Sequence, residues 1–282
     1  MPIAAVPRKA AKPLIVFSHG NSFPASTYGA MTKLLQARGY TVRAIEKIGH
    51  DPAYPVTSNW PHLVQQLADF STAEVQAAGT PVVLVGHSLG GFLSLMCAAK
   101  FPDLAGNALR GVVLLDSPII SGWRAQALSV AKVSGLAGRL GPGAVSKKRK
   151  RKWASQEEVF LHFRAKKAFA LWDNEAIRRY AEHGTVADGP VRRLAFDRDI
   201  ETAIYNNLPH NLGLLMASHP PQCPVAFIGG RQSVEIKQVG LAMTQRITEG
   251  RMRMVDGSHL FPIESPLVTA AAIDAEVTSM LM

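Results

Sequence analysis

The chain has 282 residues, of which 47% are hydrophobic and 18% are charged, so it can bury a large core and is not an intrinsically disordered protein. No run approaches the roughly 18 consecutive apolar residues of a membrane helix, so we expect no membrane span. Two cysteines, Cys97 and Cys223, exclude a disulfide framework. The charges near the N-terminus follow apolar residues, which is the wrong order for a signal peptide, and we therefore expect a cytoplasmic protein.

The net charge of +10 is unevenly distributed. Between residues 119 and 201 there are 17 Lys or Arg against 9 Asp or Glu, and residues 147–152 are all basic. Such a run can bind nucleic acid or an anionic membrane surface. No aromatic residue interleaves it and no nucleic-acid-binding motif accompanies it, so we interpret it as a solvated segment and expect no nucleic-acid partner. A non-enzymatic binding module that uses this basic segment is the alternative.

Strands and helices alternate in both outer parts of the sequence. Continuous apolar runs predict strands at 12–18, 40–46, 81–85, 111–115, 224–228 and 251–255. Helices are predicted at 25–38, 60–78, 88–100, 236–247 and 265–281. Because the strands are apolar throughout rather than at every second position, we expect a mostly parallel sheet with helices on both faces, a doubly wound α/β fold.

The alternation breaks down between about residues 117 and 205. This segment is basic, helical in character and rich in tryptophan and phenylalanine. It therefore predicts a mostly helical insertion in the α/β core.

The sequence Gly86-His87-Ser88-Leu89-Gly90 lies between a predicted strand and a predicted helix. A serine with one glycine two positions before it and another two positions after it is the nucleophile-elbow pattern. The sharp turn strains the serine backbone and leaves no room for neighbouring Cβ atoms. We therefore predict Ser88 as a catalytic nucleophile at the start of a helix, where the helix dipole favours a developing negative charge.

A serine nucleophile needs a base and an oxyanion hole. His259 follows the last predicted strand and precedes the closing helix, which makes it the predicted base. The predicted oxyanion donors are the backbone amides of Leu89 and Asn21, with Ser22 as the other possibility in the first strand-to-helix loop.

The motifs Gly86–Gly90, His19-Gly20-Asn21-Ser22 and the segment 257–266 resemble those of the α/β-hydrolase superfamily. The resemblance implies an α/β-hydrolase core at 1–117 and 206–282, with fewer leading strands than usual, and a helical cap at 118–205. It implies that the substrate is bound near His19, Gly20 and His87 of the core and Trp123 and Trp172 of the cap. The alternative for the aromatic residues is that they hold the cap together.

The resemblance also implies an acid that orients His259. Most members carry an aspartate at the position held here by Ser233, and Glu235 follows two positions later. Other members place the acid after the strand that follows the nucleophile helix, where this chain has Asp116. We expect Asp116 to be the acid and keep Glu235 as the alternative.

The expected activity is that of a serine carboxylesterase that cleaves an ester-type bond of a small acyl substrate through an acyl-enzyme. Thioesterase, lactonase, C–C hydrolase, cofactor-free peroxidase and acyltransferase activities remain alternatives because they share this machinery. No histidine or cysteine cluster has metal-ligand spacing, so we expect neither a metal nor an organic cofactor. The sequence does not indicate an oligomeric state.

Overall fold

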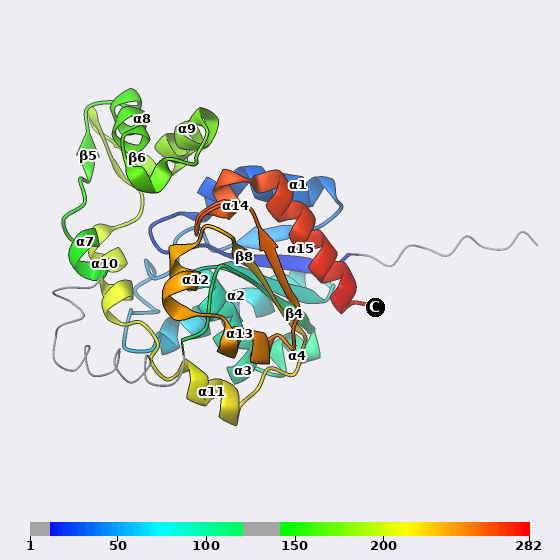
Figure 1. Ribbon diagram of the computed structural model, residues 1–282. Coiled ribbons are helices and arrows are strands. Elements are labelled where there is room, and N and C mark those ends of the chain that lie inside the picture. The colour runs from blue at the N-terminus through cyan, green and yellow to red at the C-terminus, as the bar shows by residue number, and fades with distance from the viewer. Residues whose placement is uncertain (1–11, 121–141) are drawn as a thin grey trace, which may run out of the picture.

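The centre of the protein is a parallel sheet of six strands in the order β2-β1-β3-β4-β8-β9 (Figure 1). The computed structural model describes residues 12–120 and 142–282. The strands are β1 (Leu14–Ser18), β2 (Val42–Ala44), β3 (Val82–His87), β4 (Leu109–Leu115), β8 (Val225–Gly230) and β9 (Met252–Val255). Each coincides with a predicted strand. Within the described residues no strand precedes β1, so β2 forms one edge of the sheet.

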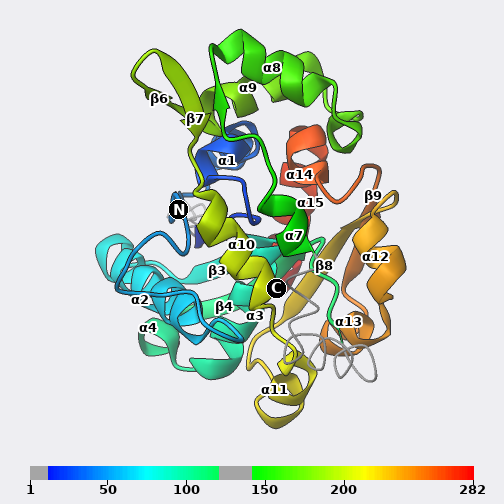
Figure 2. The same ribbon diagram turned by 90° about the vertical axis from the view of Figure 1, so that its left-hand side faces the viewer.

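Helices cover both faces of this sheet (Figures 1 and 2). The helices of the core are η1 (Ala25–Tyr28), α1 (Gly29–Ala37), α2 (Pro61–Ala78), α3 (Leu89–Lys100), α4 (Leu104–Asn107), α12 (Val234–Val239), α13 (Ala242–Ile247), α14 (Phe261–Glu264) and α15 (Pro266–Met280). Alternate strand residues enter two separate hydrophobic clusters, one packed with α1 and α15 and the other with α2 and α3. Since both sets are buried, the strands are continuously apolar, and the predicted α/β fold is confirmed.

The described part of the insertion, from residue 142 to residue 206, lies over one end of the sheet (Figure 2). Its elements are α7 (Pro142–Ser146), β5 (Lys152–Trp153), α8 (Gln156–Arg164), η2 (Lys167–Phe169), α9 (Asn174–His183), β6 (Thr185–Asp188), β7 (Val191–Leu194) and α10 (Arg198–Asn206), followed by α11 (Leu212–Ser218). The insertion is mainly helical as predicted. It also contains a small antiparallel sheet, β5-β7-β6, that the sequence did not predict.

The prediction of one continuous helix at 236–247 was wrong. The stretch 236–247 divides into α12 and α13, because Gly240 takes φ 79° and ends α12. Side-chain capping fixes the starts of several other helices, among them α8 at Ser155, α9 at Asp173 and α12 at Ser233.

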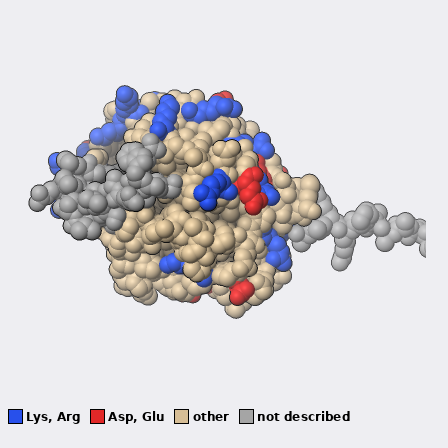
Figure 3. All heavy atoms as spheres, turned by 60° about the horizontal axis from the view of Figure 1, so that its bottom comes forward, with Lys and Arg blue, Asp and Glu red and all other residues tan. Residues whose placement is uncertain are grey.

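Half of the basic run 147–152 is paired with acidic side chains. Arg149 pairs with Glu201 at 2.7 Å and Lys152 with Asp188 at 2.9 Å, and Lys150 contacts Glu158. On the face shown in Figure 3, cationic side chains are scattered among uncharged ones. Among the described residues, no helix has the length and apolar character needed to cross a bilayer.

Candidate active site

The predicted site residues come together at one end of the sheet. Ser88 follows β3, Asp116 follows β4, and His259 lies between β9 and α14. Asn21 follows β1, and Glu235 is in the first turn of α12 after β8. Since the strands are parallel, all of these loops leave the sheet at the carboxyl ends of its strands.

Ser88 occupies a strained turn between β3 and α3. Its backbone angles are φ 51° and ψ −113°, a region that side-chain-bearing residues rarely adopt. Its backbone N–H donates to the carbonyl of Leu115 at 3.0 Å, which holds the turn against the end of β4.

Two glycines make this turn possible. A Cβ atom on Gly86 would lie 2.1 Å from the carbonyl oxygen of Gly90. A Cβ atom on Gly90 would lie 2.0 Å from the carbonyl oxygen of Ser18. Both obstacles are backbone atoms that cannot rotate away, so steric contact explains the glycine on each side of Ser88.

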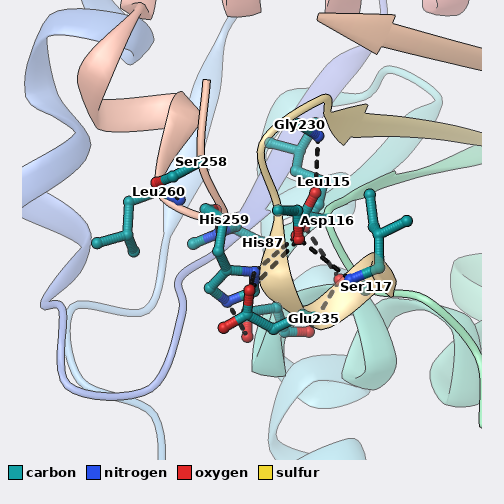
Figure 4. A network of polar contacts seen from close by, with 12 residues as sticks. His87, Leu115, Asp116, Ser117, Gly230, Glu235, Ser258, His259 and Leu260 are labelled. Atoms are coloured by element: carbon teal, nitrogen blue, oxygen red, sulfur yellow. Dashed lines mark hydrogen bonds and ion pairs between the residues drawn. The ribbon is translucent and has the colours of Figure 1, made fainter. Parts of the chain in front are cut away.

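His259 lies between the hydroxyl of Ser88 and the carboxylate of Asp116, and Figure 4 shows its contact with Asp116. Its Nε2 is 3.0 Å from Ser88 Oγ, and its Nδ1 is 2.7 Å from Asp116 Oδ2. With the proton on Nδ1, the ring donates to Asp116 and can accept the hydroxyl proton of Ser88. Its loop is fixed by Glu264, which accepts from the backbone N–H of Ser258 at 2.8 Å.

Asp116 is fully buried and both of its carboxylate oxygens are bonded. Oδ1 accepts the backbone N–H of Gly230 at 2.7 Å, and Oδ2 accepts the Ser233 hydroxyl at 2.6 Å as well as the His259 ring. These donors satisfy both oxygens of a carboxylate that is fully buried.

Glu235 is the second carboxylate near His259. Its Oε2 lies 3.7 Å from Nδ1 of His259, beyond hydrogen-bond distance, and its side chain is 45% exposed. The Ser233 hydroxyl is 3.3 Å from Glu235 and 2.6 Å from Asp116. Because Ser233 has one proton to donate, the shorter distance directs it to Asp116.

The surroundings of His259 raise its pKa above the usual value. Burial opposes the charged ring, but the hydrogen bond to Asp116 and the negative charges of Glu235, Asp116 and Glu264 outweigh it. The site therefore stabilises the imidazolium that forms when the ring accepts a proton.

Leu89 and the first loop supply candidate oxyanion donors. As the first residue of α3, Leu89 has a backbone N–H without an intrahelical acceptor. In the first loop, Ser22 has φ 79°. The Asn21 side chain donates through Nδ2 to the carbonyl of Glu201 at 3.1 Å, so a helix of the insertion holds this loop.

The structure gives three expected substrate-binding residues a different environment. His19 and His87 are fully buried, and protein atoms contact both ring nitrogens of each. The backbone N–H of Gly20 donates to the Tyr28 hydroxyl at 3.1 Å. None of the three offers a free polar group to a substrate in this conformation.

Trp172 belongs to an aromatic cluster within the insertion. It is 2% exposed and packs against Phe169 and Tyr180, with Phe23 of the core at 6.2 Å between ring centroids. Trp172 therefore packs against other aromatic side chains, as the alternative interpretation describes, and is shielded from solvent. Trp123 lies outside the described residues.

Asp116, Glu235 and His259 are a group of possible metal ligands whose donor atoms lie within 4.8 Å of one another. A zinc ion holds each ligand at about 2.0–2.2 Å, which separates tetrahedral ligand atoms by more than about 3 Å. The 2.7 Å separation of Nδ1 and Oδ2 fits a hydrogen bond better.

The sequence interpretation missed Tyr28, and it did not predict that Ser233 would contact Asp116. Tyr28 falls at a regularly spaced apolar position of the predicted helix at 25–38, and no local sequence pattern distinguishes it from an ordinary core residue. Ser233 carried a signal, because it stands where the resemblance implies an acid, but its hydrogen bond to Asp116 depends on the neighbouring position of β4 and β8.

The chain is similar to a known protein family, to proteins of known activity and to a solved structure. Residues 15–272 match the alpha/beta hydrolase family. A pyrethroid hydrolase of Sphingobium wenxiniae is 32% identical over 111 residues, which are 38% of this chain and 38% of that protein. A 2-(acetamidomethylene)succinate hydrolase of Mesorhizobium japonicum is 27% identical and covers 95% of this chain and 89% of its own. The crystal structure of E-2-(acetamidomethylene)succinate hydrolase has a TM-score of 0.68 at 25% identity, covering 96% of this chain and 93% of its own.

Proposed function

The chain belongs to the alpha/beta hydrolase family, and we propose that it is a serine hydrolase that cleaves an ester-type bond of a small acyl substrate. The observation that carries the proposal is the continuous line of contacts from Ser88 Oγ through His259 to Asp116, at 3.0 Å and 2.7 Å. A serine with this pair of partners can be deprotonated as it attacks a carbonyl.

In the first half of the proposed reaction, Ser88 Oγ attacks the substrate carbonyl while His259 Nε2 accepts the hydroxyl proton. The backbone amides of Leu89 and Asn21, or Ser22 in place of Asn21, stabilise the negative oxygen of the tetrahedral intermediate. His259 then donates its proton to the leaving alcohol, and an acyl-enzyme remains on Ser88.

In the second half, His259 accepts a proton from a water molecule that attacks the acyl-enzyme. The second tetrahedral intermediate collapses, the acid product leaves, and Ser88 recovers its proton from His259. Asp116 stays ionised in both halves and stabilises the charged ring. No step uses a metal or an organic cofactor.

We assign the acid to Asp116 rather than Glu235. Asp116 is fully buried and within hydrogen-bond distance of His259, whereas Glu235 is 3.7 Å away and 45% exposed. A buried carboxylate keeps its orientation and is less screened by water than an exposed one.

We further propose that residues 118–205 form a cap on a core made of 1–117 and 206–282. Two contacts between the insertion and the loop that follows β1 support the placement of this cap on the core. Asn21 bonds to the carbonyl of Glu201, and Phe23 packs on Tyr180 with 5.4 Å between ring centroids.

A second candidate is hydrolysis of 2-(acetamidomethylene)succinate or a similar dicarboxylate, which the full-length similarity to that hydrolase favours. A dicarboxylate needs cationic partners. Arg149, a half-buried cation among the described residues of the insertion, is already paired with Glu201 at 2.7 Å. We therefore place this candidate second to an uncharged ester.

The free cysteines support a reducing compartment, and we propose the cytoplasm. Cys97 is buried and Cys223 half-buried, and both are free. Burial raises the pKa of Cys97 to about 12 and that of Cys223 to about 11, so both remain protonated and poorly reactive.

The experiment is hydrolysis of p-nitrophenyl esters of increasing chain length by the parental protein and Ser88→Ala. We expect turnover of short esters that falls with chain length and disappears in Ser88→Ala. Ser71→Ala is the control, because Ser71 is a buried serine whose hydroxyl has no partner among the described residues. Equal turnover by Ser88→Ala and the parental protein would contradict the proposal.

The same assay distinguishes the alternatives. Thioesters, lactones and C–C substrates would replace the nitrophenyl esters, and an added alcohol would reveal acyl transfer as a new ester product. Each of these reactions would also require Ser88, so the substrate preference, not the nucleophile, decides among them.

A further inference from the structure

A buried chain of hydrogen bonds connects the loop after β1 to the loop that carries His259. The backbone N–H of Gly20 donates to the Tyr28 hydroxyl at 3.1 Å. The Tyr28 hydroxyl is 2.7 Å from Nδ1 of His87, and Nε2 of His87 is 2.8 Å from the carbonyl oxygen of His259. Tyr28 and His87 are at most 1% exposed.

The chemistry of the two ends fixes every proton in this chain. The carbonyl of His259 can only accept, so Nε2 of His87 must carry the ring proton. In a neutral ring Nδ1 is then an acceptor, and the Tyr28 hydroxyl donates to it. The Tyr28 oxygen is left to accept the N–H of Gly20, and no group in the chain is unpaired.

The fit is also steric. A Cβ atom on Gly20 would lie 2.7 Å from Nδ1 of His87 and 3.0 Å from the Tyr28 hydroxyl. A glycine is therefore needed before Asn21 so that Tyr28 and His87 can meet behind the loop. Gly20 and His87, which flank predicted catalytic positions, are thus both bonded to Tyr28.

We propose that Tyr28 and His87 are positioning residues. They hold the proposed oxyanion loop and the His259 loop in fixed positions relative to each other, and His87 does so as a neutral ring with its proton on Nε2. This inference rests on the proposed function for its catalytic consequence. Their hydrogen bonds involve neither Ser88 Oγ nor the His259 ring, although the rings of His87 and His259 pack with 4.9 Å between centroids. His87 fixes the main chain of His259, so it sets the direction of the His259 ring toward Ser88.

Burial and the neighbouring histidine rings keep His87 neutral, and three titratable groups face it. They are Tyr28 from the helix that begins at η1, His259 from the loop after β9, and His19 from the loop after β1. Burial lowers the pKa of His87 well below its usual value, the nearby His259 and His19 rings act in the same direction, and the bond to the His259 carbonyl opposes them. Burial also raises the pKa of Tyr28, so its hydroxyl keeps its proton.

The kinetic test compares Tyr28→Phe with Tyr40→Phe on p-nitrophenyl acetate. Both substitutions remove one buried tyrosine hydroxyl, and that of Tyr40 donates to Asp274 at 2.7 Å on α15, outside this chain of bonds. Because a small misplacement of a catalytic group is costly, we expect kcat to fall roughly ten- to a hundredfold in Tyr28→Phe with KM nearly unchanged. We expect kcat of Tyr40→Phe to match the parental protein. Equal kcat values in all three proteins would overturn the proposal.

Two substitutions of His87 separate positioning from proton transfer. A glutamine can donate to the His259 carbonyl but cannot carry a proton, whereas a leucine can do neither. We expect His87→Gln to stay within roughly threefold of the parental kcat and His87→Leu to lose roughly ten- to a hundredfold. An equal loss in both would show that the imidazole itself is required, and the proposal would fail.

The decisive readout is the tautomer of His87, measured by NMR on protein with ¹⁵N-labelled histidine. We expect a protonated Nε2 and an unprotonated Nδ1 between about pH 6 and 9, and loss of this fixed state in Tyr28→Phe. A parental His87 that is cationic or protonated on Nδ1 would overturn the proposal. This readout needs no activity, so failure of the ester assay would count against the proposed function alone.

Discussion

The core and the insertion of this protein encode their structures in different ways. In the core, short stretches of sequence contain most of the information, since an apolar run makes a strand and the glycine-flanked serine makes the turn after β3. In the insertion, the structure depends on contacts between distant residues. Arg149 reaches Glu201 and Tyr180, and β5 pairs with β7 across α8 and α9.

This difference indicates which groups should affect activity and which should affect stability. Groups of the core that contact His259 should change activity, whereas groups of the insertion should chiefly change stability. The exception is the contact between Asn21 and Glu201, where a helix of the insertion touches the proposed oxyanion loop. The predictions that follow test this division, beginning with the largest effect.

Asp116→Asn should reduce kcat roughly ten-thousandfold, because an amide cannot hold the His259 ring in the tautomer that accepts from Ser88. Glu235→Gln, the matched removal of the second carboxylate charge, should cost less than roughly tenfold. Steady-state kinetics on p-nitrophenyl acetate measure both. The reverse order of the two losses would show that Glu235 is the acid.

Gly90→Ala should cost more than about 3 kcal/mol of the free energy of unfolding, because its Cβ would lie 2.0 Å from a backbone oxygen. Gly143→Ala in the insertion is the matched substitution. Its Cβ would meet Asn206 Oδ1 at 2.2 Å, an atom without a hydrogen-bond partner among the described residues, so that side chain can rotate. We expect a cost below about 1.5 kcal/mol there. Urea unfolding checks both, and equal costs would remove the steric distinction.

Arg149→Met should destabilise the protein by about 2–3 kcal/mol, because it leaves the carboxylate of Glu201 buried without its partner. The value is at the low end for a buried pair because the Arg149 side chain is 21% exposed. The double variant Arg149→Met/Glu201→Gln should recover part of the loss, since no charge is then stranded. If thermal unfolding finds the single variant as stable as the parental protein, the pair does not support the insertion.

The smallest predicted effect is on the pH dependence of kcat/KM. His259 must be unprotonated to accept a proton, so activity falls as the pH drops through its pKa, which lies above the usual 6.5. The charge of Glu235 contributes to the raised pKa, so Glu235→Gln should shift the acidic limb to lower pH. A matched substitution far from the site, Glu249→Gln, should leave the limb in place. A shift of the acidic limb to higher pH in Glu235→Gln would contradict the electrostatic account.

Much of the core was predictable because its signals are local. Each of the six strands was predicted from its own residues, and the flanking motifs of Ser88 and His259 were enough to propose them as site residues. The order of the strands determines that Asp116 and Ser233 meet, and no local pattern contains it.

The insertion was less predictable for the same physical reason. Its small sheet has strands of two to four residues, too short for a periodic signal, and β5 pairs with β7 across α8 and α9. Trp172 illustrates the difficulty, because a buried aromatic side chain has the same sequence signature whether it packs against neighbours or lines a binding site.

The central claim is that Ser88 is an activated nucleophile, and covalent labelling tests it most directly. The folded protein is treated with a fluorophosphonate, and the modified peptide is identified by mass spectrometry. We predict one phosphonyl group on Ser88, no labelling of Ser88→Ala, and strongly slowed labelling of Asp116→Asn. A folded parental protein that remains unlabelled, or that is labelled equally well in Ser88→Ala, would contradict the account.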